Sequence, residues 1–164
     1  MGKKKFNSLF HLALHVTDMK KTVDFYKKVG CDEMFTLKLP DGRDWLTYMR
    51  VAPGQYLELF NTYEDHPMTP HGKVEQSDSN FFGHFSFLVP SLKYTAQQWK
   101  KEGIDLVYAP FKPEPIPVDD NFDPHVGADG NAIGWIVDPD GTWIEVMEEL
   151  DESWQKKFEE THPF

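Results

Sequence analysis

Two histidines and two glutamates stand at matched positions in this 164-residue sequence and have the side chains needed to bind a metal ion. His11 precedes His84 by 73 residues, and Glu58 precedes Glu145 by 87. Imidazole and carboxylate ligands suit Zn, Ni, Co, Mn or Fe(II). The four residues therefore predict one divalent metal site. Its chemistry would be Lewis-acid activation of an oxygen-bearing substrate, with a carboxylate available to move a proton.

An internal repeat links these four residues. The segment HLALHVTDMKKTVDFYKKVG (residues 11–30) aligns without a gap with HFSFLVPSLKYTAQQWKKEG (84–103), and GQYLELF (54–60) aligns with GTWIEVM (141–147). The second offset is larger by 14 residues, which indicates an insertion in the second copy. The proline-rich stretch 110–130 is where we place it, as a loop. Self-similarity at a fixed offset predicts two copies of one module, each with one His and one Glu.

The residue patterns predict that each module runs β-α-β-β-β in an α+β fold. The first module (8–62) has expected strands at 10–16, 32–39, 45–51 and 55–61, with a helix at 19–29. The second (81–149) has expected strands at 83–89, 104–108, 131–137 and 142–148, with a helix at 92–102. Turn residues such as Pro53-Gly54 and Asp138-Pro139-Asp140-Gly141 separate the strands. A linker (63–80) and a C-terminal helix and tail (150–164) complete a single domain, with the last helix expected at 150–160.

Strand parity predicts which side chains meet, because neighbouring residues on a strand point to opposite faces. His11, Ala13 and His15 share one face of the first strand, while Leu12, Leu14 and Val16 share the other. The same split separates His84, Glu58 and Glu145 from their apolar neighbours. If the sheets curl, the polar faces line one cup with one metal site. The candidate substrate contacts around it are His15, Tyr56, Phe60, Trp143 and, from the inserted loop, His125.

Composition excludes several other functions. The formal net charge is -10, and Arg43 and Arg50 are the two arginines, so binding to nucleic acid is not expected. No apolar run approaches the ~20 residues of a membrane span. A single cysteine, Cys31, cannot form an intramolecular disulfide and reads as a buried small residue. With no signal peptide at the basic start, a cytoplasmic location and a small-molecule partner are predicted.

These motifs resemble the vicinal-oxygen-chelate family, which includes glyoxalase I, extradiol dioxygenases and bleomycin-resistance proteins. The resemblance rests on HLALHVTDMKKTVDFYKKVG, YLELF, GHFSFLVPSL and VDPDGTWIEVME, and spans residues 8–149. It implies two βαβββ modules forming a cup-like mixed sheet. It also implies that His11, Glu58, His84 and Glu145 are the metal ligands. Glyoxalase I-like members are often homodimers, which the resemblance predicts here, with the cup either within one chain or shared by two.

The His-Glu-His-Glu set resembles that of glyoxalase I and implies a lyase or isomerase. The expected reaction moves a proton between carbons of a metal-chelated hydroxycarbonyl or hemithioacetal through an enediolate. Glu145 or Glu58 would be the base, with Glu145 preferred. An Fe(II) dioxygenase, an isomerase or epimerase of a sugar-like substrate, and a metal-free binding or resistance protein are alternatives.

Glutathione as a cosubstrate is left open by three features of the sequence. Glutathione-using relatives usually carry an arginine at the position of His15, where it grips a carboxylate of the cosubstrate. Asn61 lies near the position of their glutathione-contacting asparagine, but one residue short of the expected spacing. The scarcity of arginine points in the same direction, since Arg is the residue best suited to clamping a carboxylate.

Overall fold

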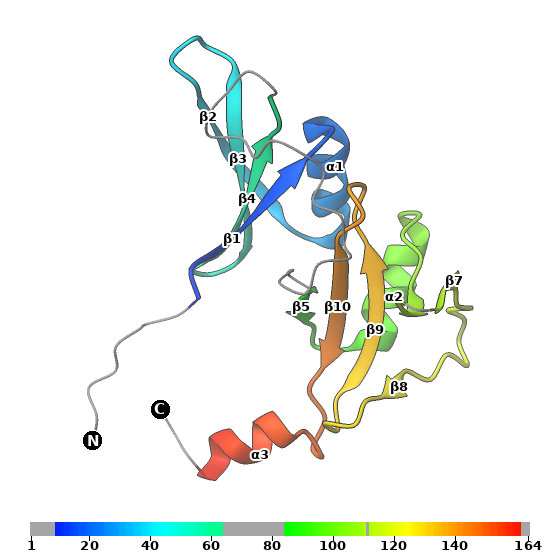
Figure 1. Cartoon of the computed structure of the whole chain (residues 1–164). Helices are drawn as coiled ribbons and strands as arrows, with labels where there is room; N and C mark the ends of the chain where they lie inside the picture. The colour runs from blue at the N-terminus through cyan, green and yellow to red at the C-terminus, as the bar shows by residue number, and fades with distance from the viewer. Residues whose placement is uncertain (1–8, 64–83, 111, 162–164) are drawn as a thin grey trace. The chain divides into compact units, whose positions relative to one another are not determined.

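The structure, a computed structural model, describes residues 9–63, 84–110 and 112–161 (Figure 1). The chain divides into two compact units, residues 1–79 and 80–164, which are described separately. Each contains the predicted βαβββ order, so the α+β fold with two tandem modules is confirmed. The described strands form two open mixed sheets, one in each unit. Tyr63 is the one residue of the predicted linker (63–80) that lies within the described residues.

The first unit is a four-stranded sheet with one helix. Its elements are β1 (His11–Val16), α1 (Met19–Val29), β2 (Asp32–Lys38), β3 (Asp44–Ala52) and β4 (Gln55–Asn61), and the strand order is β1-β4-β3-β2. The side chain of Asp18 accepts a hydrogen bond from the Lys21 N–H and begins α1. Tyr26 of the helix is fully buried with Leu57 and Leu59 of β4, which confirms the apolar face predicted from parity.

The second unit repeats this plan with additions. Its elements are β5 (Phe85–Leu88), α2 (Leu92–Lys101), β6 (Val107–Ala109), β7 (Lys112–Pro115), β8 (His125–Val126), β9 (Ala132–Val137), β10 (Trp143–Glu148) and α3 (Trp154–Thr161). The strand order is β5-β10-β9-β6-β7, and β8 pairs with β9. The Glu148 carboxylate accepts a hydrogen bond of 2.7 Å from the Leu92 N–H, which ties the end of β10 to the start of α2.

The inserted stretch 110–130 is more ordered than the predicted loop. Within it, β7 pairs with β6 and β8 pairs with β9. Pro113 and Pro115 have no N–H to donate to a neighbouring strand. Because they are two residues apart, both missing groups fall on the same edge of the strand, and the other edge can still pair. The prediction of a structureless loop was therefore wrong in part: the many prolines here restrict strand formation to the sheet edge but do not exclude it.

Apart from shifts of one or two residues, two other element boundaries differ from the prediction. Strand β6 begins at Val107 instead of 104, because the Ile104 N–H still bonds to the Trp99 carbonyl at the end of α2. Helix α3 begins at Trp154 instead of 150, after a turn in which the Ser153 N–H bonds to the Leu150 carbonyl. The Ser153 hydroxyl then accepts from the Lys156 N–H, and so caps the helix.

Two remaining predictions also bear on the fold. Cys31 is buried, and this burial raises the pKa of its thiol to about 12, as expected of a structural residue rather than a nucleophile. Among the described residues, no helix has the length and apolar content to cross a bilayer.

Two glycine-containing turns, one before β9 and one between β9 and β10, test how tightly the second unit is packed. Gly130 has a left-handed φ of 82°, and a Cβ there would lie 2.4 Å from the Glu152 carbonyl oxygen. Gly141 has a similar φ of 88° with no heavy atom within 4 Å of such a Cβ. We expect Gly141→Ala to lower the free energy of unfolding by roughly 1 kcal/mol, through backbone strain alone.

Gly130→Ala should cost at least about 1 kcal/mol more, because the start of α3 must also shift. Urea unfolding of the two variants and the wild type measures both values. Equal losses in the two variants would contradict the close packing at Gly130.

Candidate metal centre

The parallel pairing of β1 with β4 brings His11 and Glu58 together. Ala13 lies directly opposite Glu58 in the register, so His11 lies on the same face one pleat earlier. The His11 Nε2 is 3.4 Å from the Glu58 Oε2. The imidazole is 41% exposed, while the carboxylate is 12% exposed. The pair therefore presents a nitrogen and an oxygen donor at the surface of the sheet face that is opposite the helix.

The second unit reproduces this arrangement with its own residues. Strand β10 pairs in parallel with β5, and Ser86 lies opposite Glu145, just as Ala13 lies opposite Glu58. The His84 Nε2 is again 3.4 Å from the Glu145 Oε2, and the side-chain exposures are again similar, at 43% and 16%. The sequence repeat is thus a repeat of donor geometry as well as of fold.

The separation of the donors within each pair fits two ligands of one metal ion. At bond lengths of about 2.1 Å, two ligands at a tetrahedral angle lie roughly 3.4 Å apart. A direct N–H···O hydrogen bond would be expected at 2.7–3.2 Å. One imidazole nitrogen and one carboxylate oxygen are also the donor types that bind borderline divalent ions. Each pair by itself supplies half of a four-ligand set; within the described residues, no three His, Cys, Asp or Glu side chains form a single group.

The two pairs differ in what holds the carboxylate. Tyr48 is the cross-strand partner of Glu58 on β3, and its hydroxyl donates a hydrogen bond to the Glu58 Oε1. This hydrogen bond, with burial second, raises the pKa of Tyr48, so the phenol remains a donor at neutral pH. Glu58 thus has one oxygen held by Tyr48 while the other faces His11.

Trp135 is the cross-strand partner of Glu145, and so takes the place that Tyr48 has in the first unit. Its ring contacts His84 edge-on, with centroids 4.7 Å apart. Among the described residues, the one polar contact of the Glu145 carboxylate is with His84. The duplicated carboxylates are therefore chemically unequal. Glu58 is fixed by a hydroxyl, and Glu145 has no hydroxyl partner among the described residues.

Sequence reasoning did not single out Tyr48 or Trp135. For Tyr48 the reason is a β-bulge, which decides which β3 residue faces Glu58. The turn pairs Ala52 with Gln55, and continuing this register would place Met49 opposite Glu58. The shift between Arg50 and Ala52 places Tyr48 there instead. Aromatic residues on the predicted strand were a signal, but the register was not available from the sequence.

Three of the predicted substrate contacts lie on the face that carries His11 and Glu58. Tyr56 is opposite His11 in the register, and its ring packs edge-on against Phe10 at 5.0 Å. His15 is opposite Phe60, with ring centroids 5.7 Å apart. Burial lowers the pKa of His15, which is therefore mostly neutral at pH 7. A neutral imidazole does not supply the positive charge that an arginine would.

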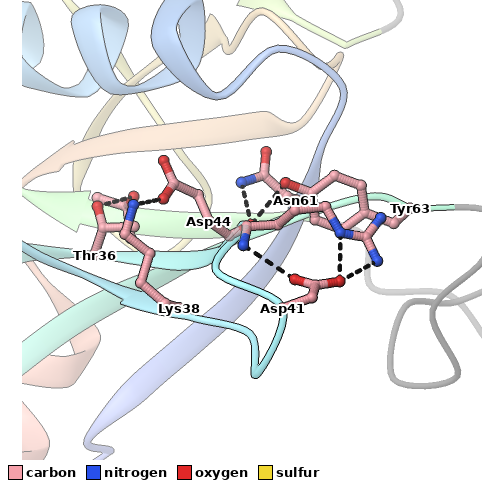
Figure 2. A network of polar contacts seen from close by, with 8 residues as sticks. Thr36, Lys38, Asp41, Asp44, Asn61 and Tyr63 are labelled. Atoms are coloured by element: carbon pink, nitrogen blue, oxygen red, sulfur yellow. Dashed lines mark hydrogen bonds and ion pairs between the residues drawn. The ribbon is translucent and has the colours of Figure 1, made fainter.

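Asn61 has a different location from the other predicted contacts. It shares the face of Leu57 and Leu59 and so points away from that of Glu58. Its amide nitrogen donates to the Asp44 carbonyl at 3.0 Å, and the Tyr63 hydroxyl donates to the same oxygen at 2.8 Å (Figure 2). These bonds hold the start of β3, which is a structural role. Contact with a substrate stays a prediction for this residue.

The remaining two predicted contacts belong to the second unit. Trp143 shares the face of Glu145, and it packs against the buried cluster of Val107, Ala109 and Trp135. His125 lies on β8 directly opposite Ile133. Because Ile133 is opposite Met147, and Met147 shares the face of Glu145, His125 is also on the face that carries Glu145.

Comparisons with known proteins agree with this fold. The chain is 24% identical over 157 residues to a lactoylglutathione lyase of Pseudomonas aeruginosa, covering 84% of this chain and 80% of that protein. The structure of a trypanothione-dependent glyoxalase I of Leishmania major matches with a TM-score of 0.58 at 19% identity, covering 96% of this chain and 94% of that one.

The structure of TnmS3, an antibiotic-binding protein from Streptomyces, matches equally well. Its TM-score is 0.59 at 15% identity, with 90% of this chain and 99% of that one covered. At such identities the solved structures show a shared fold, and enzymes and binding proteins both have it. A sequence model of one family, however, matches residues 8–146, most of the chain. By this match and by its paired βαβββ units, the chain belongs to the Glyoxalase/Bleomycin resistance protein/Dioxygenase superfamily.

Proposed function

We propose that this protein is a divalent-metal-dependent lyase or isomerase of the glyoxalase I type. It would move a proton between adjacent carbons of a hydroxycarbonyl or hemithioacetal substrate. The observation that carries the proposal is the equal 3.4 Å separation of imidazole nitrogen and carboxylate oxygen in both pairs. We propose that His11, Glu58, His84 and Glu145 together hold one ion. As a Lewis acid, that ion would polarise the two vicinal oxygens of the substrate.

Within this proposal, Glu145 is the base. It removes the proton from the carbon beside the carbonyl, holds it on a carboxylate oxygen, and returns it to the neighbouring carbon. The support is the inequality of the two carboxylates. A base must exchange a proton during the reaction, and the Tyr48 hydroxyl already occupies one oxygen of Glu58. Glu145 has no such hydroxyl partner among the described residues.

Two rival functions, an Fe(II) dioxygenase and a metal-free binding protein, predict other observations. A non-haem Fe(II) oxygenase needs two histidines and one carboxylate, so the second carboxylate would have no assigned role. A metal-free binding protein would have no use for two matched donor pairs. Metal analysis of the purified protein separates these functions: we expect close to one equivalent of a divalent metal for each site. A homodimer and a cytoplasmic location remain predictions from the family resemblance.

The cosubstrate is the second part of the proposal. Glutathione carries two carboxylates, and the arginines that would bind them are already paired. Arg43 pairs with Asp41, and Arg50 pairs with Asp32. His15 is mostly neutral at pH 7, as described above. We therefore propose that the substrate does not depend on a glutathione moiety.

Replacement of the two carboxylates tests the mechanism. Glu145→Gln should slow exchange of the carbon-bound proton of hydroxyacetone into D₂O by roughly 10²–10⁴-fold, because the general base is lost. Glu58→Gln should instead act mainly by weakening metal binding. NMR measures the exchange and metal analysis measures the content. Glu149→Gln, which changes an exposed neighbour, is the control. Full exchange in both site variants with metal bound would refute the mechanism.

The Tyr48 hydroxyl gives a second test. Tyr48→Phe should weaken metal binding by about 10–100-fold, because a residue that orients a ligand is lost. Tyr63→Phe is the matched control, since it removes a hydroxyl that donates to a backbone carbonyl instead. Titration with Zn²⁺ or Ni²⁺ against a competing chelator gives the affinities. Equal affinity in Tyr48→Phe and wild type would show that this hydrogen bond does not position Glu58 for metal.

A comparison of thiols tests the cosubstrate. We expect the hemithioacetals of methylglyoxal with 2-mercaptoethanol and with glutathione to be converted with kcat/KM values within about tenfold of each other, since little here recognises a carboxylate. His15→Arg should then favour the glutathione adduct selectively. If the wild-type protein strongly preferred the glutathione adduct, independence from glutathione would be disproved.

A further inference from the structure

A cavity of about 450 Å³ lies within the second unit, beside the inserted stretch. Its volume is in the usual range for small-molecule pockets. The wall is mostly aliphatic and aromatic, with the polar groups of Asp123 and His125 among the lining residues. The other lining residues are Val107, Tyr108, Ile116, Phe122, Pro124, Val126 and Ile133. The insertion that distinguishes the second module from the first supplies most of this wall.

Strand register places part of the cavity wall on the same sheet face as Glu145. Trp135 is opposite both Glu145 and Val107, on its two neighbouring strands. Ile133 is two residues from Trp135, and His125 is opposite Ile133. Residues that are opposite each other, or two apart on one strand, share a face. Val107, Ile133 and His125 of the cavity wall therefore lie on the face of the proposed base. Tyr108 and Val126 are neighbours of these residues along the strands and have the opposite parity. The cavity thus lies at the edge of the sheet and borders the face of Glu145.

The spacing between the two is that of a single small molecule. From strand separations and rise per residue, the Cα of Glu145 is roughly 8 Å from that of Ile133 and roughly 12 Å from that of His125. A hydroxycarbonyl group beside Glu145 could thus carry a rigid substituent that ends in the cavity. One aromatic ring spans the near part of this distance, and two linked rings span all of it.

The chemistry of the wall favours an uncharged aromatic substituent. The ring of Tyr108 already makes contacts of the kind that an aromatic ligand could share. The His125 ring packs on it at 5.1 Å, tilted by 46°, and the Lys112 Nζ lies over it, 5.2 Å from the centroid. An anionic group would meet the carboxylate of Asp123 in the wall. Neither arginine of the chain is in this unit, so the unit itself supplies no guanidinium to bind a carboxylate or phosphate.

We propose that this cavity is the specificity subsite of the enzyme, and that it binds an uncharged aromatic group attached to the hydroxycarbonyl end of the substrate. This inference rests on the proposed function for the location of the reacting end. It names the substrate class as aryl ketols or aryl-substituted hemithioacetals. The insertion in the second module therefore selects the substrate, while the duplicated donor pairs perform the chemistry.

Binding of three ketols of increasing length tests the subsite. The probes are hydroxyacetone, 2-hydroxyacetophenone and 2-hydroxy-4′-phenylacetophenone, which share one reacting end and carry no ring, one ring and two rings. Calorimetry on the full-length, metal-loaded protein should show affinity rising by roughly 10–100-fold from the first to the third, as expected for burying aromatic surface.

Two substitutions in the wall should remove this gain. Val126→Asp places a charge in the wall at a half-exposed position, and Tyr108→Ala removes the stacking ring. Ala128→Asp adds the same charge two residues away, outside the cavity lining. Tyr94→Ala removes an exposed tyrosine from α2. Both controls should keep the dependence on ring number. Circular dichroism and the unchanged affinity for hydroxyacetone show that the variants are folded.

Equal affinity for all three ketols in the wild type, or a ring dependence that survives both wall substitutions, would overturn the proposal. The proton exchange of hydroxyacetone in D₂O is measured in parallel. Loss of exchange with intact aromatic binding would refute the proposed reaction but not the subsite. Normal exchange with no ring dependence would refute the subsite alone.

Discussion

The parallel pairing of the first and last strands of each module is the constraint on which the rest depends. The two strands of each pair, β1 with β4 and β5 with β10, are distant in the sequence. In each pair, the histidine lies two residues before the residue that is directly opposite the glutamate. A slip of one residue in either pairing would turn one of the two side chains to the opposite face. The apolar faces prevent such a slip, because Leu57, Leu59, Ile144 and Val146 are fully buried.

The donor pairs are thus held by the hydrophobic core rather than by contacts of their own. Burial of four such side chains contributes several kcal/mol, whereas an exposed imidazole–carboxylate pair contributes roughly 0–1 kcal/mol. In each unit the helix packs on this apolar side and is itself held in place. Asp18 caps α1 in the first unit, and Glu148 fixes α2 to β10 in the second. The core therefore defines the geometry, and the polar face is left available for chemistry.

Duplication produced two similar pairs, and later differences gave them separate roles in our proposal. The bulge in β3 brings the Tyr48 hydroxyl to Glu58, whereas Trp135 occupies the corresponding position beside Glu145. The insertion between β6 and β9 adds an apolar cavity to the second unit. One copy thus has an anchored carboxylate. The other combines a less constrained carboxylate with a wall that could recognise a substrate.

The sequence by itself determined the modules, most element boundaries and the faces of the strands. Strand alternation and the repeat are local properties, so His11, Glu58, His84 and Glu145 could be identified from them. The tertiary structure alone decided the cross-strand register. A bulge in β3 selected Tyr48 over Met49, and the pairing of β8 with β9 brought His125 onto the face of Glu145. These outcomes depend on backbone irregularities and on pairing between distant segments, which periodicity in a single sequence does not encode.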